Sequence, residues 1–526
     1  MINYGDAIAH LHIARRVFDS RLPRFSELGS VWLPLPHILL LPFVQNYSWW
    51  ATGLAGVVPS ALAYIASCAG IYRLARNGLR RAPAALALTF FALNPNLLYL
   101  QTTAMTEPLF LCEIIWIVVW LVEWRSHLDD DPLPKGCGLQ GIAITLVAAI
   151  FTRYDGWIIA FIAWSGIALT LFRRAAARDR ARLAAPAFWL ATIVIAAAPI
   201  LWFVYNSVCF GDWLYFARGP YSAHAIELRT AAHAPGWPPH PGWHSPWVAL
   251  LFYLKVSELD SVTAPGWGNL WGNIVLALAA LGTVYAALAE KLRAHRRALA
   301  WALLLWLPVP FYAWSVAYGS VPIFFPAWWP YTWYNTRYGL ELLPALALGL
   351  GFAAQLLADS LRRITAPSSR FVLPNLAFAF LFALAGLNVF GLLRAGPIVY
   401  VESTKNALAR QPYDNAIPPA LQALLTHDPH ATVLMNTSLY PEIVAFTGIP
   451  LRQTINESDL GIFRSALDDP AAHAAIVVAF DGDEIDTAVK AHRADFTLIG
   501  NYTATNQPSA AIYASTNWLH RAPDFF

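Results

Sequence analysis

Charged residues are scarce in this sequence, and their scarcity excludes an ordinary soluble protein. Only 13% of the 526 residues are Asp, Glu, Lys or Arg, whereas 57% are hydrophobic. A typical soluble domain has about 25% charged residues. The net charge is only +3, so no nucleic-acid partner is expected. These values predict an α-helical multi-pass membrane protein that is surrounded by membrane lipids.

Cysteine is also rare, and its pattern excludes a disulfide framework. Of the four cysteines, Cys68 and Cys112 lie in apolar runs, and Cys137 and Cys209 lie in loops that we place on opposite faces of the membrane. No internal repeat, low-complexity tract or cleavable signal peptide is apparent. We therefore expect no redox chemistry.

Long hydrophobic runs dominate what the sequence does contain. A membrane-spanning helix needs about 20 apolar residues, and ten segments meet or approach this length. The predicted spans are 49–72, 82–98, 107–124, 139–152, 157–172, 185–205, 271–290, 298–317, 339–359 and 371–394.

The distribution of Lys and Arg predicts the orientation of these spans. The loops on one side include RLARNGLRR, FRRAAARDRAR, EKLRAHRR and LRRITAPSSR, and hold about half of the 35 basic residues. The loops on the other side hold very few. By the positive-inside rule the basic side is cytoplasmic. We expect a bacterial inner (plasma) membrane protein whose N- and C-terminal parts lie outside the cytoplasm.

Three parts follow along the chain. Residues 1–48 are expected to be extracytoplasmic, with an amphipathic helix at 3–20 and a proline-broken, interfacial or re-entrant piece at 31–44. Residues 49–395 form the transmembrane part. Residues 396–526 alternate strand and helix patterns and predict a small α/β domain. An external N-terminus requires either a preceding helix, lost through a misplaced start codon, or an unaided translocation of the tail.

Ionisable residues gather at the predicted outer face, where the membrane makes them costly and therefore candidates for function. They occupy separate segments: Asp6 and His10 on the opening helix, Glu107 in AMTEPLF, Arg153 and Asp155 in TRYDG, and Arg337 in WYNTRYGLELLPAL. An acid there can deprotonate an incoming hydroxyl as a general base. The guanidinium forks suit a phosphate. We expect these groups to line one site.

Each candidate also has a structural interpretation. Asp6 and Glu107 each lie in a first helical turn, where an acid favours the positive helix end. Arg153 with Asp155 is equally compatible with a structural turn pair, and Arg337 with a side chain that reaches the lipid headgroups.

A metal site is a further alternative. A divalent cation held by Asp6, His10 and Glu107 is compatible with these residue types, although no cofactor is certain. The loop HAPGWPPHPGWHSPW contains His233, His240 and His244 without helical ligand spacing, which favours a flexible lid over a zinc site.

Four short motifs resemble those of the GT-C glycosyltransferases, in particular the branch with protein O-mannosyltransferases and the lipid A aminoarabinose transferase. GDAIAHLHIARRVF is similar to the first extracytoplasmic loop of that family, with Asp6 and Arg15 at the positions of its Asp and Arg. Ala7 stands where the family has a Glu. TEPLF, TRYDGW and TRYGLELLPALAL resemble later family motifs, so that the likeness covers about residues 1–360.

The resemblance implies an inverting glycosyltransferase that uses a polyprenyl-phosphate sugar donor and a lipid, glycan or protein acceptor. By carry-over, Asp6 would activate the acceptor hydroxyl and Glu107 would assist. Substrate-binding roles would fall to His10, Arg15, Arg153, Asp155, Trp333, Tyr334 and Arg337. The loop at 206–246 would cover the acceptor.

Two other classes remain open. A multi-pass transporter or flippase has a similar number of spans, but transporters generally show paired repeats and charged or broken helices near the midplane. Here the candidates cluster at one face, which favours chemistry at the membrane surface. A scaffold whose C-terminal domain binds a partner is the third class.

Overall fold

A computed structural model describes most of the chain. The described residues are 2–130, 138–173, 181–183, 185–230, 239–262, 268–288, 298–365, 372–438 and 440–521. Cys137, His233 and large parts of three of the four basic loops lie outside them. Among these described residues, seven helical segments are long and apolar enough to cross a membrane.

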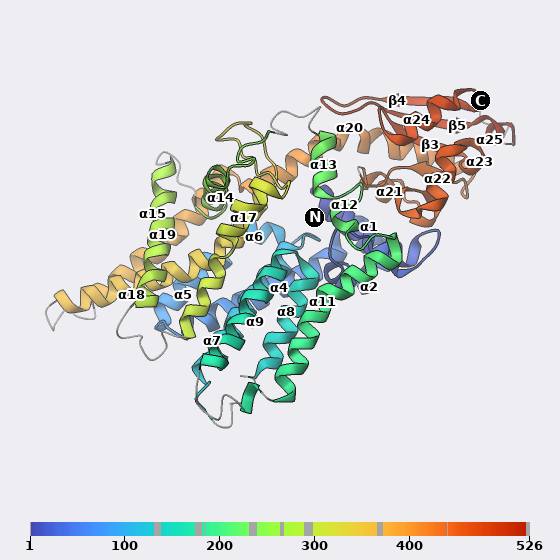
Figure 1. Ribbon diagram of the computed structural model, residues 1–526. Helices are drawn as coiled ribbons and strands as arrows, with labels where there is room; N and C mark the ends of the chain where they lie inside the picture. The colour runs from blue at the N-terminus through green and yellow to red at the C-terminus, as the bar shows by residue number, and fades with distance from the viewer. Residues whose placement is uncertain are drawn as a thin grey trace.

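The N-terminal half of the chain is helical (Figure 1). Its helices are α1 (Gly5–Asp19), η1 (Phe25–Leu28), α2 (Leu35–Val44), α3 (Tyr47–Thr52), α4 (Leu54–Arg76), α5 (Arg81–Ala92), α6 (Pro95–Leu100), α7 (Glu107–Ser126), α8 (Leu139–Thr152), α9 (Asp155–Arg173), α11 (Pro186–Phe210), α12 (Tyr215–Arg218), α13 (Ala223–Thr230) and α14 (Pro246–Ser261). The bundle continues with α15 (Gly268–Leu288), η3 (Ala300–Trp306), α17 (Pro308–Tyr318), η4 (Thr336–Leu342), α18 (Leu343–Ile364), α19 (Val372–Ala395) and α20 (Ile398–His427).

Each of the ten predicted spans is largely helical where the structure describes it, but several are not one continuous apolar helix. The span at 49–72 breaks at Gly53 between α3 and α4, and the span at 298–317 divides into η3 and α17. The span at 82–98 breaks into α5 and α6, because Asn94 caps the second helix with its side chain and Pro95 follows at the first turn. Helix α8 has only 14 residues. Helix α7 carries Glu107, Glu113, Glu123 and Arg125. The piece at 31–44 contains a regular helix, α2, with Pro42 inside it.

The basic helix ends meet at one end of the bundle. Arg73 at the end of α4 contacts Glu123 near the end of α7 at 2.5 Å, and Arg80 before α5 pairs with Asp359 of α18. Glu107 begins α7, 16 residues before Glu123. At 1.5 Å per residue the two glutamates are about 24 Å apart along the helix. The acidic and basic candidates that the sequence predicts for the outer face therefore lie far from the arginine-rich end.

The C-terminal part contains a mixed five-stranded sheet in the order β2-β1-β3-β5-β4. Strands β1 (Val433–Met435), β2 (Thr454–Ile455) and β3 (Ile476–Phe480) are parallel, and β5 (Ala510–Ser515) pairs antiparallel with β3 and with β4 (Phe496–Tyr502). Its smaller elements are α21 (Glu442–Thr447), η5 (Leu451–Gln453), η6 (Glu457–Asp459), α22 (Gly461–Asp468), α23 (Pro470–His473), α24 (Glu484–Ala491), η7 (Arg493–Asp495) and α25 (Thr516–Arg521). The strands and helices predicted for residues 396–526 are thus present in this part of the chain. The two-residue strand β2 is too short to give a periodic signal.

The N-terminal helix packs against this C-terminal part (Figure 1). Asp19 at the end of α1 contacts Arg452 at 3.0 Å. Arg21 donates hydrogen bonds to the Thr454 carbonyl and to the Thr432 hydroxyl, both at 3.0 Å. These contacts join the two ends of the chain on the side of the bundle that carries Asp6.

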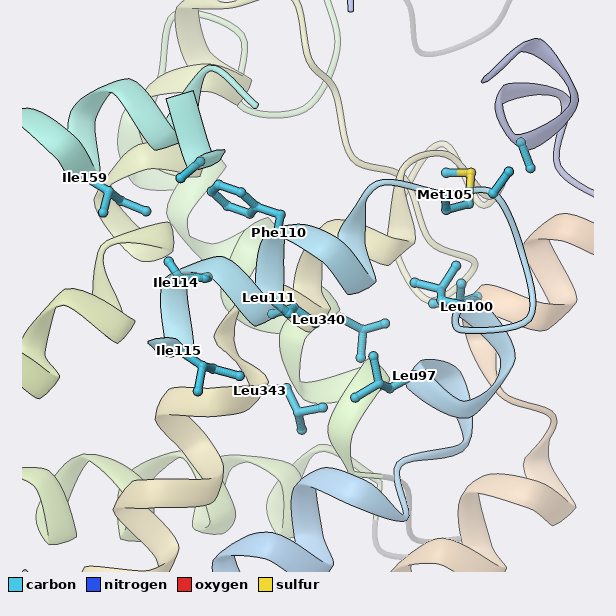
Figure 2. Packing of buried hydrophobic residues seen from close by; sticks show 14 of the residues in the cluster. Leu97, Leu100, Met105, Phe110, Leu111, Ile114, Ile115, Ile159, Leu340 and Leu343 are labelled. Carbon is cyan, nitrogen blue, oxygen red and sulfur yellow. The ribbon is translucent and has the colours of Figure 1, made fainter. Parts of the chain in front are cut away.

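An apolar layer fixes α7 against η4 directly below the charged groups. Leu111 lies one helical turn after Glu107, and Leu340 lies three residues after Arg337; both are fully buried. Figure 2 shows them within one hydrophobic cluster together with Leu97 of α6. Elements α6, α7 and η4 contact one another. Close packing of this kind resists displacement, so it holds the backbones that carry Glu107 and Arg337.

Candidate active site

Arg337 is the centre of a charged cluster built from distant segments. It lies in the 3₁₀ helix η4, just after Asn335, whose backbone adopts the left-handed conformation with φ 55°. Its Nη2 donates to Oδ2 of Asp6 at 2.7 Å, and its Nε donates to Oε1 of Glu107 at 2.9 Å. One guanidinium thus connects the first helix, the start of α7 and the entrance to α18.

Arg153 forms the second half of the cluster. It follows α8 in an extended conformation, immediately before α9. Its Nη1 lies 3.5 Å from the same Oε1 of Glu107, and its Nη2 lies 2.9 Å from Oε1 of Glu341. Its Nε lies 3.4 Å from the Asp155 carboxylate. Glu107 therefore joins the two arginines, as the prediction of a single site requires.

Two carboxylates of the cluster were not predicted. Glu341 accepts hydrogen bonds from the Tyr312 hydroxyl, at 2.6 Å, and pairs with Arg153. It lies in the motif TRYGLELL four residues after Arg337, so helical spacing could have indicated it. Glu402 of α20 lies 3.9 Å from Nη1 of Arg337. Glu402 lies more than 60 residues after Arg337 in the sequence, and no motif connects the two.

The cluster contains more carboxyl than guanidinium groups. Two guanidiniums face five carboxylates, which are Asp6, Glu107, Asp155, Glu341 and Glu402. Of the five, the sequence predicted Asp6, Glu107 and Asp155 as candidates. Each arginine contacts several of these acids at once, and these contacts offset part of the cost of burying them, since an unpaired buried carboxylate is strongly unfavourable.

Exposure separates the roles that these acids can have. The side chain of Asp6 is 42% exposed, whereas that of Glu107 is 1% exposed. A group that exchanges a proton with an incoming substrate must be reached by it. Asp6 meets this condition and Glu107 does not, so Glu107 is suited to holding the two arginines in place.

Aromatic rings separate the two guanidiniums. The ring of Tyr338 lies 5.0 Å from the guanidinium carbon of Arg337 and 5.2 Å from that of Arg153. Tyr4 adds a contact to Arg337 at 5.4 Å and Phe110 one to Arg153. Ring faces are negatively polarised and attract cations. This packing limits the motion of both arginines.

His10 lies near the cluster but bonds elsewhere. Its Nδ1 is 2.8 Å from Nε2 of His37 on α2, and its ring packs on Trp32. Within the described residues no group of three His, Cys, Asp or Glu side chains is arranged to hold a metal ion. Because Arg337 lies between Asp6 and Glu107, the cation site considered at Asp6, His10 and Glu107 does not fit this geometry.

Burial keeps the histidines of α1 neutral. It lowers the pKa of His10 from 6.5 to about 4 and that of His12 to about 3. Both nitrogens of His12 lack a hydrogen-bond partner among the described residues, and its ring packs 5.0 Å from that of Trp50. Between pH 6.5 and the lowered value, only the unfolded chain binds the proton, so stability falls as the pH drops through that window.

We expect His12→Phe to reduce this acid sensitivity. The wild-type protein should lose up to about 1.4 kcal/mol of stability per pH unit and per histidine below pH 6.5. The phenylalanine keeps the ring contact with Trp50 and removes one titrating group. Melting temperatures in detergent at pH 7.5 and pH 5.0 should therefore differ less in the variant than in the wild type. Equal differences would contradict the assignment of His12 as a buried neutral group.

The remaining predicted residues lie around the cluster. Arg15 is occupied by Asp19 at 2.9 Å and by the Val44 carbonyl at 2.7 Å, so it joins α1 to α2 and is not brought into the charged cluster. Tyr334 forms a two-way backbone bridge with Phe324. Trp333 is half-buried, and the ammonium group of Lys405 lies 4.3 Å from the centre of its ring.

The segment predicted to cover an acceptor is partly described. It contains the end of α11, the short helices α12 and α13, and residues 239–245 before α14. His240 is buried, and its Nε2 lies 3.2 Å from Oε1 of Glu227 on α13. Residues 231–238 lie outside the described residues.

Comparison with solved structures finds the same architecture elsewhere. ArnT from Cupriavidus metallidurans bound to undecaprenyl phosphate matches with a TM-score of 0.54 and 14% identity, over 96% of this chain and 93% of that one. Its apo form matches with a TM-score of 0.50, 13% identity and the same coverage. AglB, an oligosaccharyltransferase from Archaeoglobus fulgidus, was solved in complex with an inhibitory peptide and a dolichol-phosphate. It matches with a TM-score of 0.45 and 13% identity, over 98% of this chain and 70% of that one. No family model and no curated protein matches the sequence.

The helical bundle with its C-terminal sheet defines a multi-pass membrane protein. The match to ArnT along almost the whole of both chains assigns it the GT-C fold, as the sequence motifs predicted. At these identities the likeness establishes the fold, and the activity has to be argued from the site.

Proposed function

We propose that this protein is an inverting glycosyltransferase that moves a sugar from a polyprenyl-phosphate donor to an acceptor hydroxyl at the extracytoplasmic membrane face. One observation carries the proposal. The half-exposed carboxylate of Asp6 lies 2.7 Å from the buried guanidinium of Arg337, which the buried carboxylate of Glu107 contacts on another nitrogen. The solved relative of the same fold that binds undecaprenyl phosphate supports the class of donor.

In the proposed reaction Asp6 accepts the proton of the acceptor hydroxyl. The oxygen attacks the anomeric carbon from the face opposite to the phosphate, the carbon–phosphate-oxygen bond breaks, and its electron pair leaves with the lipid phosphate. The configuration at the anomeric carbon inverts. Negative charge grows on the departing phosphate, so fixed N–H donors beside it lower the barrier.

Arg337 retains capacity for that anion. A guanidinium has five N–H groups, and the hydrogen bonds to Asp6 and Glu107 use Nη2 and Nε. Glu402 lies 3.9 Å from Nη1, which is beyond hydrogen-bonding distance. The N–H groups on Nη1 are therefore available to a phosphate oxygen while the other contacts persist.

Mass spectrometry of cells with and without the protein tests this function. Cells that lack it should accumulate a polyprenyl-phosphate-linked sugar and should lose one sugar from a lipid, glycan or protein of the outer surface. Re-expression of the wild-type chain should restore both. Uptake of a substrate into sealed vesicles that contain the protein, without any covalent product, would instead identify a transporter or flippase.

A further inference from the structure

Helix α20 connects the C-terminal sheet to the charged cluster. It contacts both the N-terminal segment that carries Asp6 and the turn that precedes Arg337. Its first turn is held by Asn96, whose Oδ1 accepts from the Val399 backbone N–H at 3.0 Å. The Tyr4 hydroxyl donates to the Val399 carbonyl at 3.0 Å. Tyr4 lies two residues before Asp6, so this contact places the start of α1.

One turn later, Glu402 holds the segment that carries Arg337. Its Oε1 accepts from the backbone N–H of Asn335 at 3.1 Å, and its Oε2 accepts from that of Thr336 at 2.9 Å and also from the Thr336 hydroxyl. Glu402 is 2% exposed. Asn335 has the left-handed conformation that a non-glycine residue rarely adopts. A carboxylate that takes both N–H groups offsets the cost of that turn.

Further along the same helix, Arg410 reaches the N-terminal segment. Its Nη2 donates to the Asn3 carbonyl at 3.0 Å, and its Nε lies 2.9 Å from Oε1 of Glu442 in the C-terminal part. Residues 399, 402 and 410 of one rigid helix therefore hold residues 3 and 4 on one side and residues 335 and 336 on the other. Asp6 and Arg337, the two groups that must meet, lie just beyond these held points.

We propose that α20 is a positioning element, and that Glu402 is a positioning residue that sets the geometry between Asp6 and Arg337. The inference rests on the proposed transferase function for its kinetic consequence. Glu402 does not touch substrate in this assignment, and it acts through the 335–336 turn. A displacement of reacting groups by about 1 Å costs about a hundredfold in rate. Replacement of Glu402 should therefore lower kcat.

The test compares Glu402→Gln with Glu402→Asp and with Glu123→Gln as a matched control. Gln has the size of Glu, but it has only one acceptor oxygen. Its NH₂ group would face a backbone N–H, so one of the two backbone hydrogen bonds is lost. Asp keeps both oxygens and the charge. Glu123 is also in a short glutamate–arginine pair, with Arg73, but at the arginine-rich end of the bundle.

Hydrogen–deuterium exchange of the full-length protein in detergent gives a readout that needs no activity. In Glu402→Gln the amides of residues 3–10 should exchange about tenfold faster, because loss of a charged hydrogen bond weakens the held turn and Arg337 then no longer anchors Asp6. Glu402→Asp should restore slow exchange in part, and Glu123→Gln should leave residues 3–10 unchanged. Unchanged exchange of residues 3–10 in Glu402→Gln overturns the proposal.

Turnover of the polyprenyl-phosphate sugar donor gives the second readout. Glu402→Gln should lower kcat by about 10- to 100-fold and leave KM for the donor nearly unchanged, with partial recovery in Glu402→Asp. A rise in KM with constant kcat would overturn the positioning role. Absence of transfer by the wild-type protein would refute the transferase function alone, since the exchange measurement still decides the structural role of α20.

Discussion

Asp6→Asn is expected to abolish sugar transfer while the protein remains folded. Asparagine has the same shape and its Oδ1 can still accept from Arg337, but it cannot take the proton of an acceptor hydroxyl. General-base catalysis contributes about 10²- to 10⁴-fold, so kcat should fall by about that factor. The side chain is 42% exposed, so little packing is lost. The measurement is product formation from a polyprenyl-phosphate sugar donor, with the melting temperature in detergent recorded for each sample.

Asp19→Asn is the matched control on the same helix. Asp19 is buried, contacts Arg15 at 2.9 Å and Arg452 at 3.0 Å, and lies outside the charged cluster. Its replacement should lower the melting temperature and leave kcat near the wild-type value. The two variants thus separate catalysis from stability. Wild-type turnover by Asp6→Asn would remove Asp6 as the base.

That these candidates meet at one end of the bundle was predictable from local composition. Loops rich in arginine, and apolar runs of known length, predict that Asp6, Glu107, Arg153 and Arg337 share one face of the membrane. The structure brings all four into one network of ion pairs. The position of a group relative to the membrane follows from parity along the chain, which does not require knowledge of how helices pack.

The partners of these groups were less predictable. Glu402 lies eight residues after the end of the last predicted span, and it reaches the 335–336 turn only because α20 folds back over α6 and η4. Arg15 matches a family motif, yet Asp19, four residues later on the same helix, already offers it a local partner. A motif identifies a residue, whereas its partners depend on tertiary contacts that one sequence does not reveal.

The excess of carboxylates makes Arg337 the residue on which the stability of the cluster depends most. The side chain of Glu107 is only 1% exposed, so removal of Arg337 leaves its carboxylate buried. Of its two arginine contacts, only the one to Arg153, at 3.5 Å, then remains. Removing one partner of a buried ion pair costs about 3–5 kcal/mol, because the other charge is left uncompensated. Arg337→Met, which keeps an apolar side chain of similar length, should therefore strongly destabilise the protein.

A second substitution should recover part of that loss. In Arg337→Met combined with Glu107→Gln, the uncompensated carboxylate is replaced by a neutral amide of the same size, so the double variant should be more stable than Arg337→Met alone. Denaturation of the four proteins in detergent, from wild type to double variant, measures this coupling without any assay of activity. A double variant that is no more stable than Arg337→Met would show that Glu107 is not held ionised by Arg337. The two arginines would then owe their positions to the rings of Tyr338 and Tyr4, and the proposed support of Asp6 from behind would fail.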